Sequence, residues 1–317
     1  MNEGNALVKK QSGSEFGKPP AGRTVEELLD YGVVNIDKPK GPTTHQVADF
    51  VKKILDIKKC GHSGSLDPAV TGVVAIGLGK STKVVNYLLK AGKEYVCIMH
   101  IHKPVDEEKI RKTIQGFVGK IEQLPPVKSA VKRQKRTKNI YYIEILEIDG
   151  QDVLFKVGCE AGTYIRKLCH DIGLKLKIGA HMSELRRTKV GPFDETTSAT
   201  LHDLKDAFVF WKENGEEKEL KKIIQPMENA VAHLKKIWVL DSTINSVCHG
   251  ASLKVPGISK LDSGIKKEDT IAIMTLKEEL VATGIAEMSS EEIMKSEKGI
   301  AVKLERVFME PSVNLKV

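Results

Sequence analysis

The residues best suited to chemistry lie in one short glycine-rich segment, Gly61-His-Ser-Gly-Ser-Leu-Asp-Pro68. Glycine lets a backbone turn tightly and come close to a ligand. Pro68 favours extended backbone at Asp67, so we expect the Asp67 carboxylate on a stiff loop. A carboxylate held in this way can act as a nucleophile or a base, because its aim is fixed. An ordinary turn explains the same spacing, since Asp-Pro and Ser-Gly pairs are common in turns.

Two further segments carry side chains that could serve such a carboxylate. Gly162-Thr-Tyr-Ile-Arg166 is expected to open a helix, where Arg166 could grip a carboxylate with two donors and Tyr164 offers a ring and a hydroxyl. His181-Met-Ser-Glu-Leu-Arg-Arg187 alternates like a strand, which places Leu185 on one face with Arg187. Read alone, these are a helix start with a surface arginine and a strand with a core leucine.

Other chemistries are disfavoured by spacing. The segment Gly79-Lys-Ser-Thr82 resembles the end of a phosphate-binding P-loop, but Val74 stands where that motif needs glycine. His100 and His102 have no third ligand at a useful spacing, so we predict no metal site. The five cysteines form no Cys-x-x-Cys pair, which argues against a zinc site or a disulfide scaffold and for buried thiols in a reducing compartment.

The charge of the chain favours a polyanionic partner. Its 50 Lys and Arg residues exceed its 42 acids, giving a net charge of +8, and the segment Lys128–Lys138 has six basic residues and no acid. Such a segment is expected to be an exposed loop or ribbon edge that follows phosphates, although a solvated loop remains the alternative. The predicted RNA-binding side chains are Lys38, Lys132, Arg133, Lys135, Arg136 and Lys138.

The elements that must position these segments alternate irregularly between strand and helix. Strands are predicted at 31–37, 70–78, 95–101, 140–148, 153–157 and 182–190. Helices are predicted at 24–29, 47–55, 81–89, 105–118 and 163–176, and a highly charged helical segment at 204–234 is expected to be broken at Gln225-Pro226. Thr43 and Gln46 have the spacing of a capping box, and Asp149-Gly150 should turn a hairpin. The pattern lacks a regular βαβ rhythm, so it predicts an α+β fold with a mixed, largely antiparallel sheet.

The chain is expected to divide into unequal parts. We predict an N-terminal extension over 1–30 that docks on the rest, a main domain over 31–235, a small β-rich domain over 236–311 and a tail over 312–317. The first residues are polar and no apolar run approaches the roughly 18 residues that span a bilayer. The sequence therefore predicts no signal peptide, no membrane span and a cytoplasmic location.

Taken together, the motifs resemble those of the TruB-type pseudouridine synthases. The resemblance covers Val33 to about Leu204, and the glycine-rich Asp67 segment, Lys-Glu-Tyr95, the Arg166 segment and the Leu185 segment occur in the family's order. The C-terminal part, with His249-Gly-Ala251, is similar to a PUA domain. The chain is most similar to the dyskerin branch in its archaeal form, because long insertions after the Tyr95 strand and a lysine-rich nuclear tail are absent.

The resemblance implies a role for each site residue. Asp67 would be the nucleophile and Arg166 its ion-pair partner, while Tyr95 would stack on the target base with Tyr164 close by. Leu185 would line the pocket and His62 would contact the displaced strand. In the PUA domain, His249 and Gly250 are predicted to contact RNA. The resemblance implies no cofactor and no metal.

The function implied is guide-dependent conversion of uridine to pseudouridine in ribosomal RNA, with tRNA as a further substrate class. The expected partners are a box H/ACA guide RNA, the substrate RNA, small accessory proteins and a kink-turn-binding protein of ribosomal type. Two alternatives stay open on the sequence. One is an enzyme of the same chemistry that recognises tRNA unaided, and the other is a non-catalytic RNA-binding scaffold.

Overall fold

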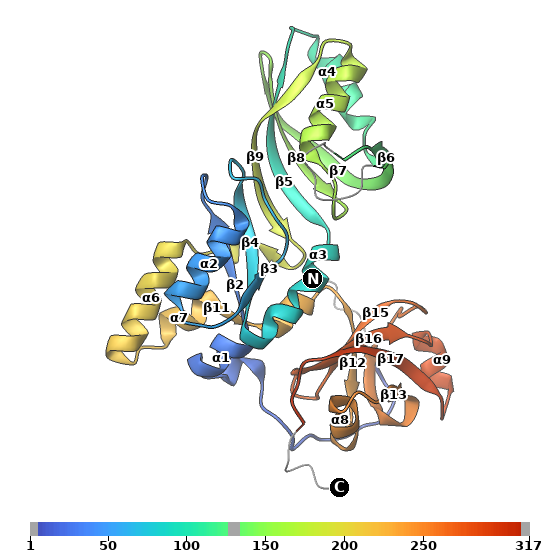
Figure 1. Cartoon of the computed structure of the whole chain (residues 1–317). Helices are drawn as coiled ribbons and strands as arrows, with labels where there is room; N and C mark the ends of the chain where they lie inside the picture. Colours follow the sequence, from blue (N-terminus) through green and yellow to red (C-terminus); the bar gives the residue numbers. More distant parts are fainter. Residues whose placement is uncertain (1–5, 126–133, 312–317) are drawn as a thin grey trace. The chain divides into compact units, whose positions relative to one another are not determined.

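The computed structural model describes residues 6–125 and 134–311 (Figure 1). The chain forms two compact units. The large unit comprises Val34–Ile224, and the small unit combines Met1–Val33 with Gln225–Val317. None of the helices in the described ranges is long and apolar enough to cross a membrane.

The large unit is built on a mixed sheet with the strand order β11-β2-β4-β9-β5-β8-β7-β6, to which β3 and β10 add at the side. Its strands are β2 (Gly32–Lys38), β3 (Cys60–His62), β4 (Thr71–Leu78), β5 (Lys93–Ile101), β6 (Gly119–Gln123), β7 (Arg136–Asp149), β8 (Asp152–Cys159), β9 (Ala180–Val190), β10 (Phe193–Asp194) and β11 (Ile224–Pro226). β5 runs antiparallel to both β8 and β9, whereas β4 meets β9 in parallel. The predicted α+β class with a largely antiparallel sheet is confirmed.

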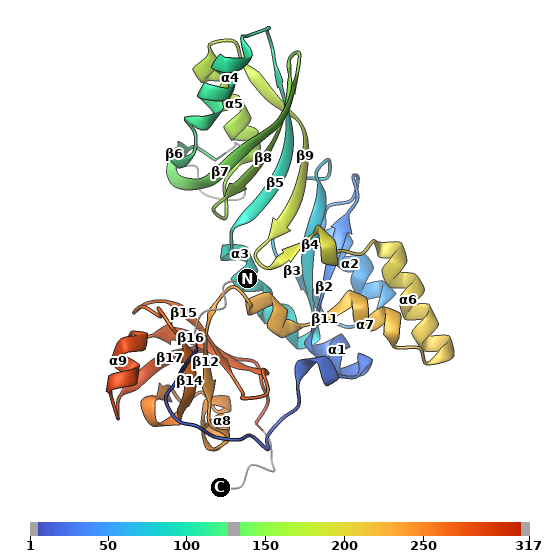
Figure 2. The ribbon, with the colours of Figure 1, turned by 180° about the vertical axis from the view of Figure 1, so that it is seen from behind.

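Helices cover the two halves of this sheet. α4 (Glu107–Gln115) and α5 (Ile165–Leu176) lie together on one face of β5, β7 and β8, while α2 (Thr44–Ile54) and α6 (Leu201–Asn214) lie beside β2 and β4 (Figures 1 and 2). Two shorter helices, α3 (Val85–Lys90) and α7 (Lys218–Ile223), complete the unit. Alternation along β5 buries Cys97, Met99 and Ile101 beneath α4 and α5, so one strand face makes the core and the other stays partly open.

Most predicted elements form close to their expected bounds. The capping box at the start of α2 is present, with the Thr43 side chain accepting from the Gln46 N–H. The predicted helix 81–89 is instead a 3₁₀ turn, η2 (Gly79–Lys83), followed by α3. The helix predicted from 163 begins two residues later, at Ile165, with Tyr164 in the N-cap position, and the Thr163 hydroxyl donates to the carbonyl of Glu160 at 2.7 Å.

The small unit has its own β sheet and core. Its strand order is β1-β14-β12-β15-β16-β17-β13, formed by β1 (Ala6–Val8), β12 (Lys235–Val239), β13 (Leu253–Lys254), β14 (Ile258–Asp262), β15 (Thr270–Met274), β16 (Leu280–Ala286) and β17 (Ile300–Val307). The helices are α1 (Val25–Tyr31), α8 (Asp241–Cys248) and α9 (Ser290–Lys295). The N-terminal segment is ordered by pairing of β1 with β14 and by a two-pronged, buried ion pair between Arg23 and Glu228 at 2.7 and 2.8 Å.

Candidate active site

Asp67 and Arg166 meet in the large unit although 99 residues separate them in the chain. Asp67 lies in the loop between β3 and β4, and Arg166 is the second residue of α5. The Arg166 Nη2 donates to Asp67 Oδ2. Both side chains are more than half exposed, so the pair faces solvent and can be reached by a large ligand. A guanidinium partner fixes the direction of a carboxylate.

Buried groups hold the loop that carries Asp67. Lys38 is fully buried, and its Nζ donates to the carbonyls of Pro39, Pro68 and Val70 at 2.9, 3.2 and 2.7 Å. Its ammonium group therefore faces the inside of the loop. The prediction that Lys38 contacts RNA does not fit this burial, because a phosphate contact needs an exposed ammonium group. The lysine instead fixes the end of the loop that follows Asp67, through the carbonyls of Pro68 and Val70.

A second buried cation holds the loop from β9. Arg187 is 1% exposed; its Nε donates to the Val73 carbonyl at 2.7 Å and its Nη2 to the Gly64 carbonyl at 3.3 Å. It also hydrogen bonds the hydroxyl of Tyr95. Burial raises the pKa of the Tyr95 phenol, so this group is neutral at neutral pH. The buried Arg187 side chain thus holds both the glycine-rich loop and Tyr95 in place.

A cavity of about 490 Å³ opens between these elements. Its lining includes five of the predicted site residues, namely Asp67, Tyr95, Tyr164, Arg166 and Leu185. His62, predicted to contact RNA, lies outside this lining, with its ring edge-on to His45 at 4.6 Å between centroids. Burial lowers the pKa of His62, which favours the neutral imidazole.

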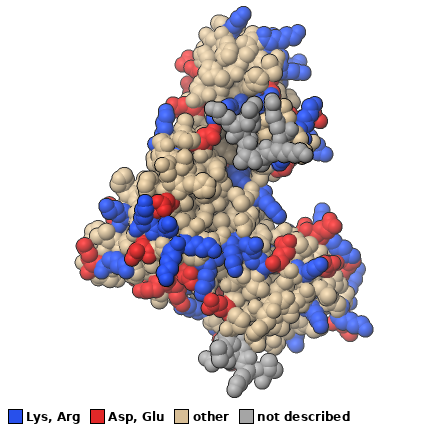
Figure 3. Space-filling view, viewed as in Figure 1, with Lys and Arg blue, Asp and Glu red and all other residues tan. Residues whose placement is uncertain are grey.

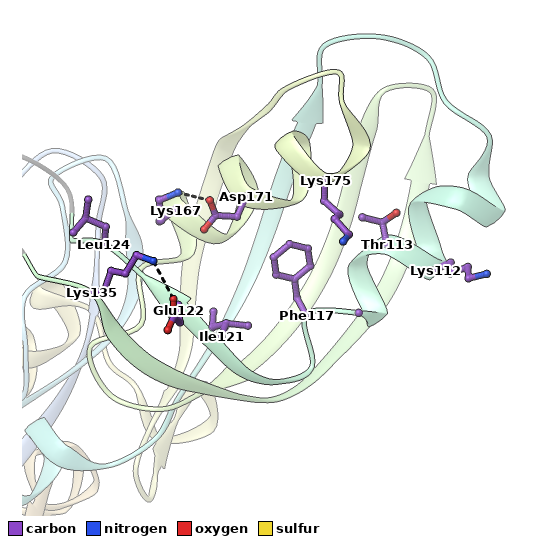
Figure 4. Close-up of a pocket in the computed structure, with 11 residues that line it drawn as sticks. Lys112, Thr113, Phe117, Ile121, Glu122, Leu124, Lys135, Lys167, Asp171 and Lys175 are labelled. Atoms are coloured by element: carbon purple, nitrogen blue, oxygen red, sulfur yellow. Dashed lines mark hydrogen bonds and ion pairs between the residues drawn. The ribbon is translucent and has the colours of Figure 1, made fainter.

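A larger cavity, of about 700 Å³, lies elsewhere in the large unit (Figure 4). It is lined mainly by residues of α4, α5 and β6. Four of its charged groups are paired with one another, Lys167 with Asp171 and Lys135 with Glu122, and Lys112 and Lys175 also line it. It contains neither Asp67 nor Arg166. We therefore place the chemistry in the smaller cavity, where an exposed carboxylate, a guanidinium group and two phenols converge.

Comparison with known protein families agrees with this geometry. Residues 52–165 match the N-terminal domain of TruB family pseudouridylate synthases, and residues 166–232 match the C-terminal domain of tRNA pseudouridylate synthase B. Residues 235–308 match a PUA domain and residues 2–48 a DKCLD domain. A protein of Pyrococcus abyssi named "Probable tRNA pseudouridine synthase B" is 58% identical over 95% of this chain and 90% of its own length. The chain belongs to the TruB family of pseudouridine synthases.

Solved structures extend the similarity of this TruB-family chain to nearly its whole length. A Cbf5-Nop10-Gar1 complex contains a chain that is 55% identical, with a TM-score of 0.94, covering 98% of this chain and 95% of its own. An H/ACA RNP bound to a substrate RNA containing 2′-deoxyuridine contains one that is 53% identical, with a TM-score of 0.91 and coverage of 98% and 96%. The predicted family, branch and C-terminal PUA domain are confirmed.

The basic residues predicted for this family member fall in different places. Lys132 and Arg133 lie outside the described residues. Lys135 is exposed and pairs with Glu122 at 3.3 Å. Arg136 begins β7, and Lys138 is held by Glu160 Oε1 at 2.8 Å and the Ala161 carbonyl at 2.7 Å. The segment therefore remains a predicted RNA contact, but Lys138 is already engaged within the protein.

A second basic surface was missed from the sequence because its members are scattered along the chain. Figure 3 shows Lys and Arg gathered over the part of the large unit where α2 and the segment 79–90 lie. Its exposed members include Lys53, Lys58, Lys59, Lys80, Lys83 and Lys90. Only the fold of β3 and β4 brings the 52–59 and 79–90 segments together.

His100 and His102 have more neighbours than the sequence suggested. The sheet register sets His100 opposite both His181 and Asp152. His100 Nδ1 lies 2.8 Å from Asp152 Oδ1, and His102 Nε2 lies 3.0 Å from His181 Nδ1. In the ranges 6–125 and 134–311, no three such side chains are arranged to hold a metal ion.

In the small unit, the predicted RNA-binding pair follows helix α8. His249 Nδ1 lies 2.8 Å from the carbonyl of Asn245, and Gly250 has a positive φ of 89°. Both residues are exposed, so this turn is accessible to a partner.

Proposed function

We propose that this chain isomerises uridine to pseudouridine in RNA at the Asp67 cavity, as the catalytic subunit of a guide-directed box H/ACA ribonucleoprotein. One observation carries the proposal. The Asp67–Arg166 pair stands beside Tyr95 and Leu185 in a single cavity, in a chain whose whole length resembles the protein in an H/ACA RNP bound to substrate RNA.

The cavity residues suit the steps of this isomerisation. A uridine inside a helix must be extruded, at a cost of a few kcal/mol. Stacking of the base on Tyr95 would return about 1–3 kcal/mol. Asp67 would then attack the sugar or the pyrimidine ring, or act first as a base, with Arg166 holding the carboxylate in place. The reaction adds no group and changes no oxidation state, so it calls for no cofactor.

The partners proposed for this chain are a guide RNA, the substrate RNA, small accessory proteins and a kink-turn-binding protein. The support is that similar chains were solved in complexes named Nop10-Cbf5 and Cbf5-Nop10-Gar1. The lysine-rich surface over α2 and 79–90 and the segment beginning before β7 offer two places for RNA phosphates. We further propose a cytoplasmic location, in keeping with five free cysteines, and keep the predicted domain limits 31–235 and 236–311.

A tRNA-modifying enzyme that works unaided is the second candidate. It is favoured by the names of relatives such as the Methanosarcina barkeri protein, 54% identical over 98% of this chain. The purified full chain should be incubated with uridine-labelled tRNA, and separately with a synthetic hairpin guide, its target RNA and accessory proteins. Guide-dependent action predicts that target conversion needs the guide. Full activity on tRNA without guide or partners would refute guide dependence, whereas weak activity on tRNA would not.

A further inference from the structure

The side chains that line the Asp67 cavity carry more positive charge than negative charge. They comprise one carboxylate, Asp67, and three cations, Lys93, Arg166 and Arg187. Arg166 is paired with Asp67, which leaves the two charges of Lys93 and Arg187. In the described part of the chain, the titratable groups facing Lys93 are Arg187, Cys159 and Lys138, and those facing Arg187 are Tyr95, Lys93, Lys38 and His62. No carboxylate is among them.

Both cations are buried and are solvated only by neutral groups. Lys93 is 8% exposed, and its Nζ donates to the carbonyls of Leu88, Leu89 and Ala91 at 2.9, 2.8 and 2.7 Å, where helix α3 ends. Arg187 is bound by carbonyls and by the Tyr95 hydroxyl. Carbonyl dipoles stabilise a buried charge without cancelling it. Burying two positive charges beside the same cavity without a carboxylate partner costs free energy. This cost suggests that the electric field of the two cations has a function in the cavity.

The proposed isomerisation produces an anion in this place. When the C1′–N1 bond breaks, its electron pair stays on N1, and the detached uracil carries one negative charge shared with O2 and O4. The sugar is neutralised by bonding to the Asp67 carboxylate or by losing a proton from its neighbouring carbon. The base then bonds to C1′ through C5, as the bond from C1′ to the Asp67 carboxylate breaks or the neighbouring sugar carbon regains its proton. It loses the C5 proton and gains one on N1. Between these steps the uracil is anionic and must be retained.

We propose that Lys93 and Arg187 form a positive floor of the cavity that stabilises the detached, anionic uracil. This inference rests on the proposed function and deepens it. All three Lys93 donors are taken by carbonyls, so the lysine acts through its charge rather than by gripping a phosphate. Bound uridine is neutral, and the charge appears only as the bond breaks. The two cations should therefore speed the chemical step and leave RNA affinity unchanged.

The test uses the full chain in its assembled complex and measures single-turnover formation of pseudouridine. Lys93→Met should slow the chemical step by about 10- to 100-fold without weakening RNA binding. Lys93→Arg, which keeps the charge, should restore most of the rate. Lys156→Met is the matched control: this lysine pairs with Glu144 and stands opposite Val96, on the other face of the sheet from Tyr95, and its loss should leave the rate unchanged.

Two readouts separate a charge effect from damage to the fold. On 5-fluorouridine RNA, where C5 carries fluorine and has no proton to lose, the readout is breakage of the C1′–N1 bond, measured on both substrates. Fluorine withdraws electrons and stabilises the leaving base, so the fold-loss in Lys93→Met should be clearly smaller on 5-fluorouridine RNA than on uridine RNA. Burial, followed by repulsion from Arg187, lowers the pKa of Lys93 to about 8. The wild-type rate should therefore fall above about pH 8, and this fall should be absent in Lys93→Arg.

The outcomes are distinct. Equal losses on both substrates, or an alkaline fall that persists unchanged in Lys93→Arg, would overturn the positive floor while leaving the enzyme assignment intact. A wild-type complex that forms no pseudouridine would overturn the proposed function and this inference with it. If Lys93→Met does not fold, as judged by circular dichroism, Lys93→Arg still decides the pH readout, and Arg187→Gln removes the charge of the second cation for the 5-fluorouridine comparison.

Discussion

The backbone of Gly72 lies directly against the backbone of Arg187, and a Cβ atom on Gly72 would overlap the Arg187 carbonyl oxygen and come within 2.8 Å of its nitrogen. The two residues are register partners where β4 meets β9 in parallel, and Gly72 has a φ of +105°. This contact sets the position of the Asp67 loop relative to Arg187 and Leu185. Glycine is needed here for two reasons, close approach and backbone conformation.

Gly72→Ala should lower the free energy of unfolding by about 3 kcal/mol or more, because it adds both a steric overlap and strain. Gly41→Ala is the control. Gly41 has a similar φ of +117°, but no atom of the described residues lies within 4 Å of a Cβ built there. It should cost only about 1–2 kcal/mol, the strain alone. Urea unfolding of both variants measures the difference, and equal losses would contradict the close-contact account.

Asp67→Asn should reduce pseudouridine formation by at least about 10³-fold while RNA affinity stays unchanged, because the change keeps the shape and removes the charge. Asp49→Asn is a matched control, since Asp49 is an exposed carboxylate of α2 paired with Lys52 and Lys53. Single-turnover rates and a binding isotherm are sufficient. Undiminished turnover in Asp67→Asn would favour the third hypothesis from the sequence, a non-catalytic RNA scaffold.

Local signals in the sequence predicted local structure well. The hairpin of β7 and β8 forms with Asp149 opposite Asp152, and the Thr43 capping box starts α2. In both cases neighbouring residues contain the whole signal. The proximity of Asp67 and Arg166 is different, because no periodicity links positions 99 residues apart. Only the family resemblance put these two side chains together.

The sequence did not predict which polar side chains are buried or which residues face each other across neighbouring strands. A lysine in a Pro/Gly loop looks exposed, yet Lys38 and Lys93 are both buried on backbone carbonyls. The backbone carbonyls that accept from each lysine cannot be identified from the sequence, because they come together only when the loops have folded. In the same way, His181 and Asp152 reach His100 only through the pairing of β9, β5 and β8. The cavity's excess of positive charge was therefore invisible until the strands were placed.

Neutralising Lys132, Arg133, Lys135 and Arg136 together should flatten the salt dependence of RNA binding. Each lost phosphate contact removes about 0.7–0.9 from the slope of log affinity against log salt, so four contacts amount to about 3. The exposed Lys135–Glu122 pair at 3.3 Å is weak and should open easily for a phosphate. The control neutralises Lys212, Lys218, Lys221 and Lys222 of α6 and α7. An equal change of slope in both sets would argue against a dedicated arm.

Tyr142 and Glu94 are joined across an intervening strand, and this link should make stability depend on pH. The Tyr142 ring covers Gly158 of β8, where a side chain would overlap it, and its hydroxyl donates to Glu94 of β5. Burial pushes the pKa of Glu94 up, but the hydrogen bonds from Tyr142 and Thr188 outweigh it and hold the pKa below its ordinary value of 4.5.

A carboxyl group whose pKa is lowered by folding stabilises the protein above its ordinary pKa, and this contribution is lost as pH falls through the lowered value. Tyr142→Phe should therefore cost about 1 kcal/mol of unfolding free energy at pH 7, and the deficit should shrink as Glu94 becomes protonated in acid. Tyr141→Phe, a change at the neighbouring exposed tyrosine, should have little effect at either pH. Urea unfolding at pH 7 and pH 4 tests this. A deficit that stays constant with pH would show that the Tyr142 hydroxyl stabilises the fold independently of the charge of Glu94.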